Sequence, residues 1–345
     1  MRNISKMLIT AAAAALTMMS LAACGTNAVP AATTAAETTT AAAETTAAAE
    51  ATTAAAEKKT FKVGVLQLVQ HGALDQSNQG FVDALKAEGV DCEIDQQNAS
   101  GEQSACQTIS EKFVNDKVDL IYTIATPAAQ AASAATTEIP IVLSAVTDPQ
   151  GSGLVESNDA PGGNVTGTSD LTPVKEQIDL LVKLLPDAKR VGILFCSAES
   201  NSEIQAQMAR EACDAAGLQH EDFTVSSSNE IQTVVESMVG KVDVIYAPTD
   251  NTIAAGMATV SQVATDNGLA VICGEENMVK EGGLATYGID YYQLGYLAGQ
   301  QAADILLNGK NPGDIPIGYL EASKCSLVVN QETADLLKID VSSVK

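Results

Sequence analysis

The sequence predicts an α/β protein built from two Rossmann-like lobes with parallel sheets. Short β-branched runs alternate with amphipathic helical stretches from Phe61 onward, which is the pattern of βαβ units. The same series of segments occurs a second time, since KVGVLQ at residue 62 resembles RVGILF at residue 190. Hydroxyl, amide and carboxylate residues follow the ends of the predicted strands in both copies. Open parallel sheets hold their ligands at these strand ends.

The first copy predicts four strands separated by three helices. Apolar, β-rich runs predict strands within residues 61–69, 91–97, 118–126 and 139–148. Apolar residues at helical spacing predict helices within residues 75–89, around Gln103–Asn115 and around Pro127–Thr136. Gly89 ends the first of these helices. Thr126 followed by Pro127 is a typical helix start, with the threonine as N-cap and the proline at the first helical position.

The second copy keeps the order of the first. The segments VDVIYAPTD at residue 242 and GLAVICGEE at residue 268 resemble VDLIYTIAT at residue 118 and EIPIVLSAV at residue 138. Between the first two strands, Ile204, Met208 and Ala212 share one face of a helix that Gly217 ends. A last long helix follows Asp290, and Gly309 closes it. Two similar α/β lobes therefore stand side by side.

The N-terminus predicts export and a membrane anchor. Residues 1–23 have the layout of a signal peptide, because Arg2 and Lys6 precede an apolar run that is too short for a comfortable spanning helix. The ending Leu21-Ala22-Ala23-Cys24 resembles the lipobox of bacterial lipoproteins, whose cysteine is diacylated after cleavage. The alternative is an ordinary signal peptide with an incidental cysteine. Residues 24–59 are mostly Ala, Thr and Glu, so a disordered linker follows the lipidated Cys24.

Charge and missing motifs exclude several classes of function. The formal net charge is −24, which repels DNA and anionic lipid headgroups, so no nucleic-acid partner is expected. The sequence holds no GxSxG, Walker-A or zinc spacing, so no enzyme, metal site or cofactor is expected. A two-lobed racemase would need matching cysteines, yet Cys196 aligns with Leu68 and Cys273 with Leu143. Whether any of the six cysteines beyond Cys24 pair stays open.

Two acidic residues at helix starts are candidates for binding a ligand cation. Asp250 occupies the position in the second copy that Thr126 occupies in the first. A hydroxyl and helix-start amides on one lobe and a carboxylate on the other suit a zwitterion. Asp290, which precedes the last helix, is a second acidic candidate. For Thr126, Asp250 and Asp290 alike, the alternative is that the residue only caps its helix.

Three runs carry a resemblance to a known family: VGVLQLVQHGALD, IPIVLSAVTDPQGSGLVESNDAPGGNVTGTSD, and IYAPTDNTIAAGM with GGLATYGIDYYQLGYLAG. They resemble the ABC-transporter substrate-binding lipoproteins of the tryptophan/aromatic-amino-acid type, within the type I periplasmic-binding-protein superfamily. The resemblance covers residues 61–341. It implies two lobes joined by a three-segment hinge, with ligand trapped in the cleft. Lobe 1 would hold residues 61–169 and 291–320, and lobe 2 residues 170–290 and 321–345.

The resemblance also implies which residues bind the ligand. The carboxylate of an amino acid would be held by Thr126, Ser144 and Thr147, and its ammonium by Asp250 and Asp290. Loops that line the cleft in this family correspond to Gln70, His71, Ser200 and Asn201. His71 is read equally well as a solvated loop residue, and Tyr287 and Tyr291 either pack against a ligand side chain or serve the structure.

The function implied is an extracytoplasmic receptor, lipid-anchored to the cell membrane. A monomer would bind an amino-acid-like ligand such as tryptophan or tyrosine by hinge closure and present it to an ABC permease. Two other interpretations stay open: a ligand sensor of the same fold that signals to a membrane partner, and a binder of another small polar solute. A transcription regulator is disfavoured, because the N-terminus holds no helix-turn-helix and the charge is wrong for DNA.

Overall fold

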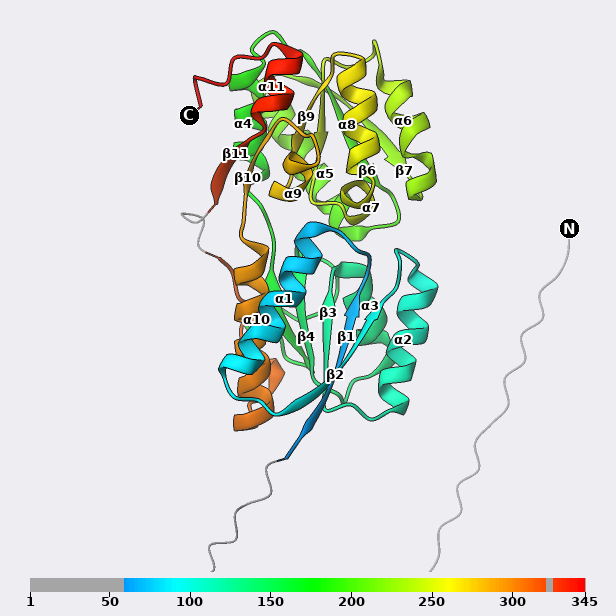
Figure 1. Ribbon diagram of the computed structural model, residues 1–345, viewed down its shortest axis with the longest axis vertical. Helices are drawn as coiled ribbons and strands as arrows, with labels where there is room; N and C mark the ends of the chain where they lie inside the picture. The colour runs from blue at the N-terminus through cyan, green and yellow to red at the C-terminus, as the bar shows by residue number, and fades with distance from the viewer. Residues whose placement is uncertain (1–58, 321–324, 345) are drawn as a thin grey trace, which may run out of the picture. The chain divides into compact units, whose positions relative to one another are not determined.

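The computed structural model describes residues 59–320 and 325–344. The predicted signal peptide, the lipidation site Cys24 and the linker up to residue 58 lie outside the described residues. The described chain contains two sheets, one in each lobe, and helices that cover both faces of each sheet (Figure 1). The α/β fold with two sheets of mostly parallel strands is the one that the sequence predicts.

The first lobe is built on a five-stranded, fully parallel sheet with the order β2-β1-β3-β4-β5. Its strands are β1 (Phe61–Gln67), β2 (Cys92–Asn98), β3 (Leu120–Ile124), β4 (Ile141–Val146) and β5 (Val165–Ser169). The central strands β3 and β4 are buried along their whole length, which their continuous apolar runs require of a sheet covered on both faces.

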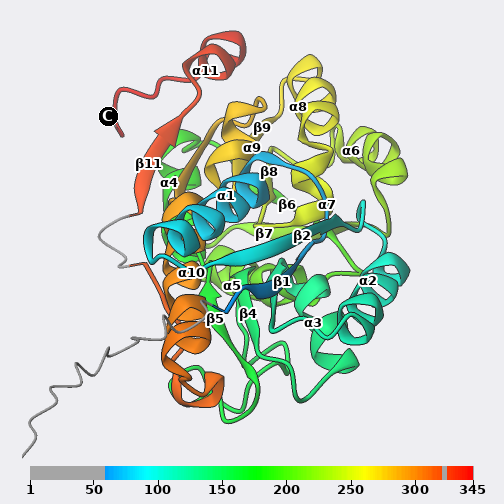
Figure 2. The same cartoon turned by 60° about the horizontal axis from the view of Figure 1, so that its bottom comes forward.

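Four helices cover this sheet: α1 (Gly72–Ala87), α2 (Gln103–Asn115), α3 (Thr126–Ala135) and α10 (Tyr291–Asn308). Figure 2 shows α1 and α10 on one face of the sheet and α2 and α3 on the other. Helices α1 and α10 pack closely because each has a glycine that lies against the backbone of the other helix. A Cβ atom on Gly295 would overlap the carbonyl oxygen of Ser77 in α1, and one on Gly80 would overlap that of Tyr292 in α10.

The second lobe is built on a six-stranded sheet with the order β11-β10-β9-β8-β6-β7. Its strands are β6 (Arg190–Cys196), β7 (Gln219–Val225), β8 (Val244–Ala247), β9 (Ala270–Cys273), β10 (Ala285–Gly288) and β11 (Ser326–Val329). All neighbours run parallel except β11, which pairs antiparallel with β10 at the edge. The sequence analysis did not predict β5, β7 and β11. In β7 only Phe223 and Val225 are buried, so an apolar-run criterion passes over it.

Separate apolar cores lie on the two faces of the second sheet. One core lies under α4 (Val174–Leu184), α5 (Ser200–Ala216) and α11 (Gln331–Leu337). The other lies under α6 (Ile231–Met238), α7 (Asn251–Ala255), α8 (Met257–Asp266) and α9 (Glu276–Lys280). Two short 3₁₀ helices complete the described elements, η1 (Ser228–Glu230) and η2 (Pro312–Asp314).

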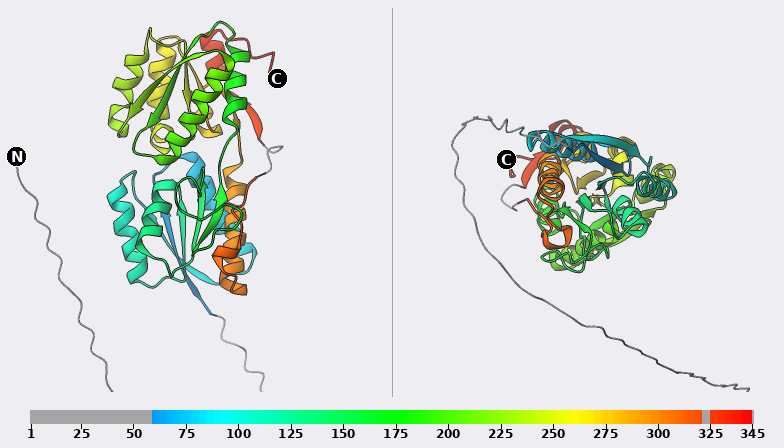
Figure 3. Two further views of the ribbon diagram at one scale, coloured as in Figure 1. Left: turned by 180° about the vertical axis from the view of Figure 1, so that it is seen from behind. Right: turned by 90° about the horizontal axis from the view of Figure 1, so that it is seen from below.

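The chain passes between the two sheets on one side of the lobes (Figure 3). Residues 170–173 connect β5 to α4, and residues 289–290 connect β10 to α10. A further connection runs from η2 to β11 and includes residues 321–324, which lie outside the described residues. Within residues 59–320 and 325–344, no helix is long and apolar enough to cross a membrane.

Candidate ligand-binding site

A buried cavity lies where the carboxyl ends of the two sheets face each other. Its empty space is about 280 Å³ with open solvent counted, and the part that could hold the centre of a water molecule is about 10 Å³. The first lobe and the connecting segments contribute His71, Leu74, Ala145, Thr147, Asp170 and Tyr291. The second lobe contributes Asn201, Thr249, Asp250, Asn251, Ala254 and Glu275. The cavity therefore lies where the topology of two parallel sheets predicts a ligand.

Direct hydrogen bonds between the lobes enclose the cavity. The Gln205 amide donates to Thr147 Oγ1 at 3.2 Å, and His71 Nε2 lies 3.4 Å from Asn251 Oδ1. Further bonds across the lobes join Gln76 to Asn277, Gln130 to Ser200, and Gln103 to the carbonyl of Ala198. These glutamines and asparagines hold the two lobes together around the cavity.

Three buried acids line this cavity, and among the described residues no lysine or arginine lines it. The acids are Asp170, Asp250 and Glu275, and each is less than 5% exposed. Burial is the main cause that raises the pKa of Asp170 to about 6 and the pKa values of Asp250 and Glu275 to about 7. The negative charge of Glu199 also raises the pKa of Asp250. Such a site favours a cationic group in its ligand.

Asp250 is a helix cap as well as a lining residue. Its Oδ1 accepts the backbone N–H of Ile253 at 2.7 Å, so it is the N-cap of α7. Its Oδ2 accepts the backbone N–H of Cys196 at 2.6 Å and the hydroxyl of Ser202 at 2.7 Å. The sequence predicted that Asp250 is either a ligand-binding residue or a helix cap. Both positions coincide, because the cap of α7 lies at the cavity wall.

Glu275, in the next loop, likewise lines the cavity and caps a helix. Its two oxygens accept the backbone N–H groups of Asn277 at 2.6 Å and Met278 at 2.7 Å, and it is the N-cap of α9. Glu275 was not among the candidates predicted from the sequence. The missed indication is an acid directly after a buried strand, in the same position as Asp250.

Asp170 differs from the other two acids in its partners. Its Oδ2 accepts the hydroxyl of Tyr291 at 2.8 Å, whereas its buried Oδ1 has no hydrogen-bond partner among the described residues. The hydroxyl of Thr147 lies near enough to lower the pKa of Asp170 somewhat. Sequence reasoning missed Asp170, because strand β5 ahead of it reads as a polar Gly/Thr loop.

Three further sequence candidates line the cavity next to the acids: Thr147, which accepts the Gln205 amide, His71 and Asn201. His71 has a lowered pKa because burial disfavours its charged form, and its Nδ1 has no partner. Asn201 donates to Glu199 at 3.3 Å and leaves its buried Oδ1 without a partner. Ala145 lies beside them with φ of 54°, a conformation that costs an alanine free energy. Unpartnered polar atoms and local strain are typical of a binding site.

The structure places the other candidates away from the cavity lining. Ser144 is buried in the first lobe, where its hydroxyl bonds Ser77 at 2.8 Å and Thr168 at 3.1 Å. Gln70 and Ser200 are exposed at the edges of the cleft. Asp290 is also exposed and accepts the backbone N–H of Gln293 at 3.1 Å, so it is the N-cap of α10 and does not line the cavity.

The expectation that Thr126 caps α3 is wrong. Thr126 is the first helical residue, and the cap position is Ala125, with φ of 89° and no side-chain hydrogen bond. A positive φ at Ala125 carries the chain out of β3 one residue earlier than the sequence pattern predicts. The Thr126 hydroxyl is buried and has no partner.

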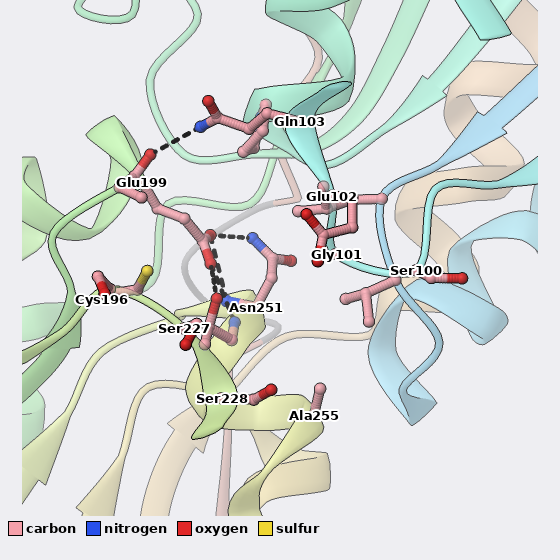
Figure 4. A pocket seen from close by; sticks show the side chains of 16 residues that line it. Ser100, Gly101, Glu102, Gln103, Cys196, Glu199, Ser227, Ser228, Asn251 and Ala255 are labelled. Atoms are coloured by element: carbon pink, nitrogen blue, oxygen red, sulfur yellow. Dashed lines mark hydrogen bonds between the residues drawn. The ribbon is translucent and has the colours of Figure 1, made fainter. Parts of the chain in front are cut away.

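A second, more open pocket of about 700 Å³ lies beyond Asn251 (Figure 4). Gln103 and Glu102 face it from the first lobe, and Ser227 and Ser228 face it from the second. Glu199 lies between the two spaces and accepts hydrogen bonds from Asn251 and Thr252, the first residues of α7. This outer pocket is the mouth of the cleft on the side away from the connecting segments.

Two α/β lobes with a buried polar cavity between their sheets are typical of proteins that bind a small solute. Within the residues that the structure describes, no group of side chains could hold a metal ion. Residues 62–344 match the family described as ABC transporter substrate binding protein, and the chain belongs to this family.

Individual relatives are similar over most of their length. A tyrosine-binding protein of Clostridioides difficile (strain R20291) is 41% identical over 295 residues, which are 84% of this chain and 85% of that protein. The structure of an ABC domain in complex with L-Trp from Streptococcus pneumonia is 38% identical, with a TM-score of 0.79 over 82% of this chain and 96% of that one.

A ligand-free, open substrate binding protein with adhesive properties from Clostridium difficile is 40% identical. It covers 83% of this chain and 97% of its own, but its TM-score is only 0.63. At nearly equal identity, the present structure is thus more similar to the complex with L-Trp than to the ligand-free, open protein.

Proposed function

We propose that this chain binds an aromatic amino acid in the cavity between its lobes and presents it to the permease of an ABC importer. The observation that carries this proposal is the set of three buried acids, with no lysine or arginine in the cavity lining within residues 59–320 and 325–344. A ligand ammonium supplies the positive charge that the cavity lacks. The hydroxyl and amide groups of Thr147, Thr249, Asn201 and Asn251 suit the ligand's carboxylate.

The apolar part of the lining suits an aromatic side chain. Leu74, Ala145 and Ala254 are the apolar residues of the lining, and Tyr291 contributes a phenol ring. The similarity to a tyrosine-binding protein and to a complex with L-Trp supports the same ligand class. The two alternatives, a sensor of the same fold and a receptor for another polar solute, make different predictions in the ligand test below.

Ligand binding is proposed to stabilise the closed arrangement of the lobes. The higher similarity to the L-Trp complex than to the open protein supports this, as do the hydrogen bonds between the lobes. The connecting segments 170–173 and 289–290 would then act as the hinge together with the connection from η2 to β11. A closed, liganded receptor would be the form that docks on the permease.

ABC substrate-binding proteins act outside the cytoplasm, and we place this chain there as well. Residues 1–23 would export it, and diacylation of Cys24 would hold it at the membrane beside its permease. The linker up to residue 59 would let a monomeric receptor reach that partner.

A thermal-shift panel of the twenty amino acids, with sugars as controls, tests this proposal. The chain from residue 25 onward is suitable, because residues 56–345 form one compact unit. L-Tyrosine or L-tryptophan should raise the unfolding temperature most. Stabilisation by sugars or branched-chain amino acids alone would contradict the proposed ligand class. A receptor that binds aromatic amino acids but co-purifies with a membrane kinase would favour the sensor.

A further inference from the structure

We propose that Asp170 is the residue that binds the ammonium group of the ligand, through its unpartnered oxygen Oδ1. This inference rests on the proposed function and deepens it, because it selects one of three buried acids. The sequence analysis gave this role to Asp250 and Asp290. The structure places Asp290 at the surface. Among the three buried acids, the number of free acceptor sites distinguishes the one best able to bind an ammonium.

The three acids differ in the number of acceptor sites that are still free. An ionised carboxylate has about four lone-pair sites. Asp250 already receives three donors, from Ile253, Cys196 and Ser202. Glu275 also receives three, two backbone N–H groups and the Asn277 side chain at 3.3 Å. Asp250 and Glu275 therefore each keep about one free acceptor site.

Asp170 receives the hydroxyl of Tyr291 on Oδ2, and the hydroxyl of Thr147 is its other nearby side-chain donor. Asp170 lines the cavity and is only 4% exposed, and its buried Oδ1 has no hydrogen-bond partner in the part of the chain that the structure describes. A buried carboxylate oxygen without a donor costs free energy comparable to a lost hydrogen bond. A donor on the ligand would remove this cost.

Among the described residues, none that lines the cavity supplies a lysine or arginine cation to Asp170. The titratable groups that line the same cavity are His71, Asp250, Glu275 and the Tyr291 hydroxyl. Burial favours the neutral form of His71, and the other groups are acids. An ammonium ion is a compact cation with three donors. It would donate a hydrogen bond to Oδ1 and also neutralise the negative charge of the Asp170 carboxylate.

The position of Asp170 also connects this contact to the movement of the lobes. Asp170 lies in the segment between β5 and α4, and Tyr291 begins α10 directly after the segment between β10 and α10. Their bond at 2.8 Å therefore joins two of the connections between the sheets. An ammonium on Asp170 would hold this pair from the cavity side, while Thr147 and Gln205 bond across the lobes close by.

The test compares Asp170→Asn with Asp250→Asn and with the exposed control Asp290→Asn. L-Tyrosine and L-tryptophan are titrated by calorimetry into the chain from residue 25 onward. Asparagine keeps the shape of Asp170 and an acceptor for Tyr291 but removes the charge. We expect the Kd of Asp170→Asn to rise about 10- to 100-fold, as for the loss of a charge-assisted bond. Asp290→Asn should bind like the wild type.

Thermal unfolding without ligand separates a binding role from a structural one. Asp170→Asn removes a buried charge that has no cation, so its unfolding temperature should equal or exceed that of the wild type. Asp250→Asn should unfold at a lower temperature, because a neutral amide cannot accept all three donors. A drop in both stability and affinity for Asp170→Asn would show a structural role and overturn the inference.

Failure of this inference differs from failure of the proposed function. If the wild type binds neither L-tyrosine nor L-tryptophan, the proposed function is wrong. If the wild type binds and Asp170→Asn binds equally well, only the assignment of Asp170 is wrong. A structure of the wild-type complex gives a second test that needs no variant. The ligand nitrogen should lie within about 3.2 Å of Asp170 Oδ1, and an ammonium that contacts only Asp250 or Glu275 would overturn the assignment.

Discussion

With the lobes closed as they are in this structure, the free energy of unfolding should fall as the pH rises from 5 to 7.5, and Asp170 should account for a measurable part of that fall. Burial raises the pKa of Asp170 from 3.8 to about 6. A carboxyl whose pKa is higher in the folded state stabilises the fold below its unfolded pKa. This contribution is lost as the pH rises through the folded pKa. For these two pKa values the loss between pH 5 and 7.5 is about 1.4 kcal/mol.

Other groups titrate over the same range and must be separated from Asp170. The pKa values of Asp250 and Glu275 are raised to about 7, so both acids contribute with the same sign. The lowered pKa of His71 acts in the opposite direction, because its contribution is present above pH 6.5 and is lost as the pH falls. These groups remain in the variant Asp170→Asn, so the difference between the two proteins isolates Asp170.

Urea unfolding of both proteins at pH 5 and at pH 7.5 measures this difference. The wild type should lose about 1.4 kcal/mol more than Asp170→Asn over the interval, with equal m-values. In a thermal scan this corresponds to a shift of about 2–5 °C. Equal pH dependence of the two proteins would refute the reasoning, because Asp170 would then titrate alike in the folded and unfolded chains.

Three further predictions concern packing, closure and anchoring. Gly295→Ala should lower the free energy of unfolding by about 1–3 kcal/mol in urea, because the new methyl group would overlap the Ser77 carbonyl; wild-type stability would contradict the close packing of α1 and α10. Gln205→Ala should weaken ligand binding about threefold to tenfold in calorimetry, because its amide joins Thr147 across the lobes; an unchanged Kd would remove this bond from the closing contacts. Cys24→Ser should release the protein from the membrane fraction with its ligand affinity intact, and retention at the membrane would exclude Cys24 as the anchor.

Much of the fold could be predicted from the sequence because strand and helix periodicity is a local property. The apolar runs that became β1, β3 and β4 are buried on both faces, and the repeat placed their counterparts in the second lobe. Strands β5 and β7 were missed for the same reason. Thr, Gly and charged residues dominate them, and only their neighbours in the sheet make them strands.

The candidate site was predicted at the level of strand ends and not at the level of side chains. Asp250 and Asp290 occupy equivalent positions along the chain, since each follows a strand and caps the next helix. Only the packing of the lobes distinguishes them, because Asp250 is 2% exposed at the cavity wall and Asp290 faces solvent. Ser144 looks like a ligand contact in sequence, yet Ser77 and Thr168 take its hydroxyl.

The sequence by itself determined the fold class, the two-lobed repeat and the acidic character of the chain, because periodicity and composition are written along the backbone. The tertiary structure alone decided that Asp170, Asp250 and Glu275 line one cavity, in which no described lysine or arginine takes part. Asp170 and Asp250 lie 80 positions apart in the sequence, and Asp250 and Glu275 lie 25 apart. They are buried only because the fold brings their three loops together. The unpartnered Oδ1 of Asp170 depends on every neighbour that could have donated to it, so no local pattern could have predicted it.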